Sequence, residues 1–333
     1  MEPTLFHPKE AAMSLDLTVM EPGCSLGRAG EVLELRRGGD TLDSIPLHRV
    51  RSLSMGPGVG ISTDLLVALA DRGATVLVQD RQERTGAVLF APRAFGAAAL
   101  RRAQCRAATG PEGMQVAQGL VGAKLVHQAR LLRLFGQAIG ANRARLELAG
   151  LSMDIQGLAG RVRAMPDRPS LMALEAQGAR LHWRGVGLMV PLRERVYPHA
   201  EDLVNQLLNY GYAVLGRAWM QVSLLAGLDP HQGVLHGDRM GRPSLILDLM
   251  EPWRPWVDRT VVGLMRQGVR LESCQGELTG ETRHRLLGAL ERCFNAHPPK
   301  QRFPLRALWL RNTRQLGRHL VGDCPWFPFI TFP

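Results

Sequence analysis

The sequence predicts an α+β fold, with a small N-terminal β-rich domain followed by a larger all-α domain. Up to Pro92, short apolar runs alternate with Gly and Pro turns, which is typical of strands. Beyond it, apolar residues recur at helical spacing, and residues 112–151 contain no proline. A chain of 333 residues also exceeds the roughly 250–300 residues that one core supports. We expect an N-terminal extension (1–12), a β-rich domain (13–95) and a helical domain (96–333).

The first domain is expected to contain short strands and one helix. Glycine and proline between the first strands predict successive hairpins. Ser62 or Thr63 can cap a helix that ends at Gly73. The expected strands cover 15–20, 31–36, 41–46, 49–55, 74–79 and 86–91.

The second domain is expected to be a set of helices with proline and glycine at the joints. The proline-free stretch 112–151 reads as continuous helical periodicity, and Ser170 can cap the helix that follows it. Tyr210, Tyr212, Trp253 and Trp256 are more typical of a core than of catalysis or base stacking. Further helices are expected over about 171–183, 198–227, 248–267, 280–295 and 303–321.

The charge balance favours a polyanionic partner. The net charge is +11 and the pI is about 10.4, and only three of the 41 basic residues are lysine. Arginine pairs bidentately with phosphate, so nucleic acid is favoured over a membrane surface. A GC-rich genome would also raise arginine over lysine, but it would not explain the excess over acidic residues.

Five scattered cysteines without CxxC spacing, and no run of about 18 apolar residues, predict a reduced cytoplasmic protein that does not enter a membrane.

One segment carries an imidazole and two carboxylates close together in sequence. Asp248 and Glu251 are spaced i, i+3, so both would lie on one helix face and could share a cation. His236 precedes them in a Gly-rich segment that could turn back toward the same ion. Oxygen ligands with one imidazole favour Mn²⁺ or Mg²⁺ over zinc. The spacing alone is more typical of surface carboxylates and a hydrogen-bonded histidine than of a metal site.

Longer strings around these residues resemble the CRISPR adaptation integrase family. They are LMALEAQGARLHWR (171–184), NYGYAVL (209–215) and GLDPHQGVLHGDRMGRPSLILDLMEPWRP (227–255). The resemblance implies a Mn²⁺- or Mg²⁺-dependent DNA endonuclease and integrase that joins the 3′-hydroxyl of a DNA fragment to the CRISPR repeat. It implies that Glu175, His236 and Glu251 are the catalytic metal ligands, with Asp248 as an additional candidate.

The resemblance also implies an assembly. It predicts a homodimer formed largely through the β-rich domain, and a small second adaptation subunit that bridges pairs of dimers.

Several basic side chains are candidates for DNA contacts. Around the predicted metal ligands they compete with simple carboxylate pairing, and on the last helix they form one face at spacings i, i+3 and i+7, which a solvated helix would also show. The candidates are Arg239, Arg242, Arg254, Arg259, Arg311, Arg314, Arg318 and Lys124.

Two other functions fit the same residues. One is a DNA-binding scaffold without catalysis, and the other is a metal-dependent hydrolase of a small phosphoester, for which the basic charge would be incidental.

Overall fold

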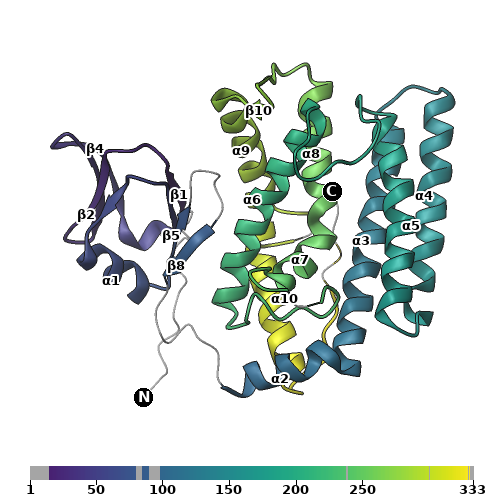
Figure 1. Cartoon of the computed structure of the whole chain (residues 1–333), viewed down its shortest axis with the longest axis horizontal. Coiled ribbons are helices and arrows are strands. Elements are labelled where there is room, and N and C mark those ends of the chain that lie inside the picture. Colours follow the sequence, from purple (N-terminus) through teal and green to yellow (C-terminus); the bar gives the residue numbers. More distant parts are fainter. Residues whose placement is uncertain are drawn as a thin grey trace, which may run out of the picture. The chain divides into compact units, whose positions relative to one another are not determined.

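The computed structural model describes residues 15–79, 85–89, 98–237, 239–299, 301–328 and 330, and the predicted extension 1–12 lies outside them. The chain divides into two compact units, 1–95 and 96–333. Both strands and helices are present, which confirms the α+β class (Figure 1). Each unit is described by itself.

Two four-stranded sheets form the first unit. One sheet has the order β1-β5-β7-β8 and the other the order β4-β3-β2-β6. The first sheet is built from β1 (Leu15–Val19), β5 (Val50–Met55), β7 (Thr75–Gln79) and β8 (Thr85–Leu89). The second is built from β2 (Cys24–Ala29), β3 (Val32–Arg37), β4 (Asp40–Pro46) and β6 (Gly60–Ile61).

Successive hairpins were the wrong expectation for part of this unit. Strands β2, β3 and β4 pair antiparallel in chain order, as do β7 and β8, whereas β1, β5 and β7 pair in parallel and are joined by crossovers. Strand β2 was also missed, because its sequence CSLGRA has one glycine and few β-branched residues. The short helices are η1 (Leu47–Arg49) and α1 (Thr63–Asp71), which follows Ser62 as predicted.

The second unit is a set of packed helices. Its elements are α2 (Ala98–Thr109), α3 (Pro111–Gln137), α4 (Arg143–Arg161), η3 (Val162–Ala164), α5 (Arg168–Gly187), α6 (Leu203–Leu225), α7 (Ser244–Met250), η4 (Glu251–Trp253), α8 (Arg254–Arg266), α9 (Gly280–Asn295) and α10 (Leu305–Leu320). A hairpin of two-residue strands, β9 (Ser273–Cys274) and β10 (Glu277–Leu278), corrects the expectation of an all-α domain.

Local capping chemistry corrects two predicted helix boundaries. The stretch 112–151, predicted only as helical periodicity, contains the end of one helix and the start of another, because the Asn142 side chain accepts a hydrogen bond from the Arg145 amide at 2.9 Å and starts α4 anew. Helix α5 is capped by Asp167 rather than Ser170, since the Asp167 carboxylate accepts the Ser170 amide at 2.8 Å. Side-chain capping therefore decided boundaries that apolar periodicity left open.

The helix expected over 248–267 is broken, and this break matters for the site. Helix α7 begins earlier, at Ser244, and the 3₁₀ turn η4 interrupts the run, with Pro252 inside that turn. Proline lacks the amide hydrogen that a continuing α-helix requires. Asp248 therefore lies in the last turn of α7 and Glu251 at the start of η4, where the Glu251 amide donates to the Asp248 carbonyl.

Helices α3, α4 and α5 lie side by side (Figure 1). Glycine allows α5 to approach α3 closely: a Cβ at Gly178 would lie 2.2 Å from Leu125 Cδ2, and one at Gly185 would lie 2.6 Å from Leu132 Cδ2. Leu125 is next to Lys124, and Gly178 lies three residues after Glu175. The close approach therefore brings the Lys124 and Glu175 side chains within reach of each other.

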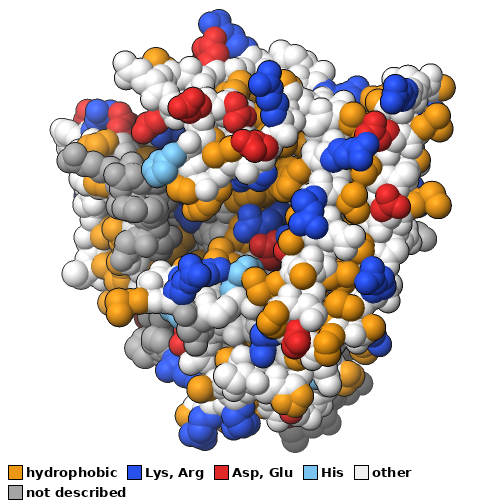
Figure 2. Space-filling view, turned by 45° about the vertical axis from the view of Figure 1, so that its right-hand side comes forward, with side chains coloured by type: hydrophobic (Ala, Val, Ile, Leu, Met, Phe, Trp, Pro, Cys, Tyr) orange, Lys and Arg blue, Asp and Glu red, His pale blue; other side chains and the backbone are white. Residues whose placement is uncertain are grey.

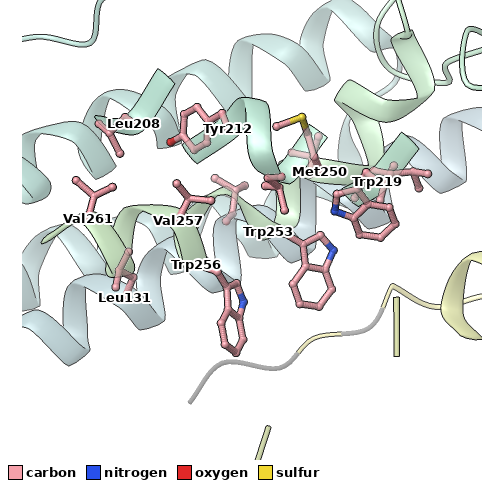
Figure 3. Close-up of a cluster of buried hydrophobic side chains, with 14 of the residues drawn as sticks. Leu131, Leu208, Tyr212, Trp219, Met250, Trp253, Trp256, Val257 and Val261 are labelled. Carbon is pink, nitrogen blue, oxygen red and sulfur yellow. The ribbon is translucent and has the colours of Figure 1, made fainter. Parts of the chain in front are cut away.

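An aromatic core supports the turn that carries Glu251 (Figure 3). Trp219, Trp253 and Trp256 are all at most 4% exposed, and the Trp219 ring stacks on Trp309 with centroids 5.1 Å apart. These side chains and Tyr212 belong to one buried cluster, which confirms their interpretation as core residues. The η4 turn is thus held on a rigid apolar base.

Among the described residues, the structure contains no helix with the length and apolar content needed to cross a membrane.

Candidate active site

Three charged side chains from distant parts of the second unit meet at one point. Lys124 on α3 forms ion pairs with Glu175 on α5 and with Glu251 on η4. The Lys124 Nζ atom lies 2.5 Å from Glu251 Oε2, and the second oxygen of Glu251 accepts a hydrogen bond from Arg254 Nε at 2.9 Å. One ammonium therefore bridges the two carboxylates that the sequence predicted to bind a metal.

Electrostatics favours the ionised form of Glu251. Burial alone would raise the pKa of this carboxyl, but the positive charges of Arg254 and Lys124, with a contribution from His236, lower it to about 2. The same carboxylates raise the pKa of Lys124 despite its burial. At neutral pH the cluster thus contains negative oxygens that require a cation.

Asp248 has a different position from the one predicted. Its carboxylate is fully buried and accepts hydrogen bonds from the amides of Val234 (2.6 Å), Leu235 (2.9 Å) and His236 (3.1 Å). It also contacts His236 Nδ1 at 2.5 Å. Because its oxygens are engaged in this way, the geometry favours a positioning role for Asp248 over direct ligation of an ion.

Other side chains hold the loop that carries His236. Gln104 on α2 donates to the carbonyls of Asp229 (2.8 Å) and Gln232 (3.1 Å) and accepts from the Asp229 amide. Arg168 on α5 donates to the Val234 carbonyl at 2.5 Å. Sequence reasoning missed Gln104 and Arg168, because their partners lie far away in the chain and no local pattern marks them.

A second buried network lies behind Arg254. The Arg254 guanidinium lies 4.5 Å from the centre of the Tyr212 ring, and the Tyr212 hydroxyl donates to Asp258 Oδ1 at 2.5 Å. The other oxygen of Asp258 lies 2.8 Å from His182 Nε2. The network thus lies against Arg254, and Arg254 itself holds one oxygen of Glu251. The sequence did not predict a role for Asp258 or His182, because the two residues are far apart in the chain and neither belongs to a recognisable catalytic motif.

The donor set fits a hard divalent ion. Glu175 and Glu251 supply oxygens, and the Asp248 contact to Nδ1 leaves His236 Nε2 as the nitrogen for a metal, an arrangement common among metal-bound histidines. Within the part of the chain that the structure describes, no three Asp, Glu, His or Cys side chains are grouped closely enough to hold an ion as they stand. The ammonium of Lys124 separates the two glutamates, so ligation would require that ammonium to move.

The structure corrects one predicted DNA contact. Lys124 is only 7% exposed and is paired with two carboxylates, so it does not lie on a basic surface. Arg254 likewise pairs with Glu251 and packs on Tyr212. Of the two interpretations considered for Arg254, DNA contact and carboxylate pairing, the geometry therefore shows carboxylate pairing.

The remaining basic candidates keep surface positions. Arg239 is exposed, and Arg242 and Arg259 are partly buried. Arg311, Arg314 and Arg318 are exposed on one side of α10, and the buried Trp309 and Leu316 lie on the other. On the face shown in Figure 2, basic side chains gather around a central hollow in which an acidic side chain and a histidine are also visible. DNA contact by these arginines stays a prediction.

Comparison with known proteins identifies the family to which the chain belongs. Residues 17–292 match the family model described as CRISPR associated protein Cas1. A CRISPR-associated endonuclease Cas1 of Pyrobaculum aerophilum is 38% identical over 252 residues, covering 75% of this chain and 82% of the relative.

Solved structures share the fold. A casposase bound to its integration product has a TM-score of 0.77 at 18% identity, with 95% of this chain and 93% of the casposase covered. A chain of a Cas6-RT-Cas1–Cas2 complex has a TM-score of 0.75 at 18% identity, with 99% of this chain and 37% of that chain covered. The family match extends over most of the sequence and includes Lys124, Glu175 and Glu251; the chain belongs to the Cas1 family of CRISPR-associated proteins.

Proposed function

We propose that this protein is a divalent-metal-dependent DNA endonuclease and integrase, which joins the 3′-hydroxyl of a DNA fragment to a phosphate at the CRISPR repeat. The observation that carries the proposal is the meeting of Glu175 and Glu251 around a single positive charge. Carboxylates that converge from separate helices and hold a cation between them are what a divalent-ion site for phosphoryl chemistry needs.

Glu175, Glu251 and His236 Nε2 would hold a Mn²⁺ or Mg²⁺ ion. When bound, the ion supplies charge neutralisation for the phosphate under attack and orients the attacking oxygen. The protein's own groups set the geometry: Asp248 fixes the orientation of the His236 ring, and Arg254 holds one oxygen of Glu251. No covalent enzyme intermediate is required.

The exposed arginines of α10 and Arg239, Arg242 and Arg259 would contact the phosphates of duplex DNA. The positive net charge of +11 supports a polyanionic substrate. Partners of the same kind as those named for similar structures, an integration product and a Cas2 subunit, fit this function. We extend the proposal to a homodimer formed through the β-rich unit and bridged by a small second subunit.

A strand-transfer assay tests the reaction. Purified protein, its small partner, a labelled DNA fragment and a supercoiled plasmid with a CRISPR repeat would be combined with and without Mn²⁺. We expect Glu175→Ala, His236→Ala and Glu251→Ala each to lower strand transfer by at least ~100-fold, because loss of a ligand should exceed the 10- to 100-fold effect of losing a supporting residue. DNA affinity should change little.

The outcomes separate the alternatives. Wild-type rates in all three variants would refute the assigned site. Tight, salt-sensitive DNA binding without strand transfer at any Mn²⁺ concentration would indicate a scaffold. Hydrolysis of a small phosphodiester that excess duplex DNA leaves unaffected would indicate a small-molecule phosphoesterase.

A control variant outside the metal site is Arg311→Ala. It should weaken DNA binding about equally for all sequences and reduce the salt slope by about one, as expected for the loss of one phosphate contact. Strand transfer at saturating DNA should be unchanged.

A further inference from the structure

The position of Lys124 has a consequence for metal binding. Its side chain is 9% exposed, and its ammonium contacts carboxylate oxygens from two different elements, α5 and η4. A divalent ion that bridges Glu175 and Glu251 would need the same oxygens. The ammonium therefore lies where such an ion would have to lie.

The ammonium also explains how the buried Glu251 carboxylate and the partly buried Glu175 carboxylate can both lie beside the same atom without a metal. Like charges at this distance repel, and a positive group between them removes the repulsion. Glu251 would stay partnered if Lys124 moved away, because Arg254 holds its other oxygen at 2.9 Å. Lysine has a flexible four-carbon stem, so its charge can leave without a change of the helix backbone.

Building on the proposed function, we propose that Lys124 is an internal counter-ion that the divalent ion must displace. In the metal-free protein it holds Glu175 and Glu251 together and stabilises the fold. The same contacts compete with the ion, so Lys124 lowers the affinity of the site for metal and keeps the protein inactive at low ion concentration.

The test is direct metal binding without DNA. Mn²⁺ titrations followed by electron paramagnetic resonance would compare the wild type with Lys124→Met, which keeps the apolar stem and removes the charge. We expect Lys124→Met to bind Mn²⁺ with a Kd at least roughly tenfold lower, a size typical of coupling between competing sites. Without metal its melting temperature should fall, and Mn²⁺ should raise that temperature by more than in the wild type.

Arg133→Met is the matched control, because Arg133 is an exposed cation on the same helix α3. Its Mn²⁺ affinity should equal that of the wild type. If Lys124→Met fails to fold, Lys124→Gln replaces it with the same expectation.

Equal or weaker Mn²⁺ binding by the Lys124 variant, with binding by the wild type intact, would overturn the counter-ion role and leave the proposed function standing. Absence of Mn²⁺ binding in both proteins would overturn the metal site itself.

Discussion

Asp248 and Glu251 are three residues apart, yet their surroundings differ in kind. Asp248 is bonded to three backbone amides and an imidazole, whereas Glu251 is bonded to the side chains of Lys124 and Arg254. Backbone amides cannot leave without unfolding the loop, but a lysine can swing away. The comparison shows that two buried carboxylates in neighbouring turns can differ in the kind of partner they have, one fixed by backbone and the other paired with side chains that can move.

The largest expected effect compares the two carboxylates with matched substitutions. Asp248→Asn places an amide group against backbone donors and should lower the free energy of unfolding by about 3–5 kcal/mol, the range for breaking a buried charged arrangement. Glu251→Gln should cost only about 2 kcal/mol, because the amide oxygen can still accept one of the two charged hydrogen bonds and Lys124 keeps Glu175 as a carboxylate partner. Urea denaturation at neutral pH measures both. Equal losses would break the comparison.

The backbone beneath Glu251 can be tested through pH. His127 Nδ1 lies 2.6 Å from the Pro252 carbonyl, and burial lowers the pKa of His127 to about 4. The unfolded chain takes up this proton near pH 6.5 and the folded chain does not, so stability is full above pH 6.5 and is lost as the pH falls to about 4. The loss should be about 3 kcal/mol at ~1.4 kcal/mol per pKa unit.

His127→Gln removes the titrating group while it retains a donor for Pro252. Its stability should be nearly constant between pH 6.5 and about 4.5, measured by urea denaturation at a series of pH values. If His127→Gln lost as much stability above pH 4.5 as the wild type does, that loss would have to come from other groups.

Glu251 affects stability in a lower pH range. Its pKa is lowered from 4.5 to about 2, so its contribution to stability is present above pH 4.5 and is lost toward pH 2.

The smallest expected effect concerns the network behind Arg254. Tyr212→Phe removes the hydroxyl that donates to Asp258 but keeps the ring beneath Arg254. We expect a loss of about 1–2 kcal/mol in the free energy of unfolding, typical of one hydrogen bond to a charged group. Mn²⁺ affinity should change by less than about threefold. A larger change in Mn²⁺ affinity would show that the network, rather than Arg254 alone, positions Glu251.

The sequence by itself determined the two kinds of secondary structure and the stretches that carry the candidate ligands. Apolar periodicity predicted most helices, and the strings around Glu175, His236 and Glu251 identified the family. These signals are local, since each depends on residues within a few turns of one another.

Only the tertiary structure decided which cation meets which carboxylate. Lys124 is 51 residues from Glu175 and 127 from Glu251, and was expected on a basic surface. Its buried position depends on how closely α3 and α5 pack, which Gly178 permits, and on the packing of η4 against α3, which brings Glu251 to the Lys124 ammonium. Sequence spacing does not encode such contacts, because they arise from packing between elements whose separation along the chain is arbitrary.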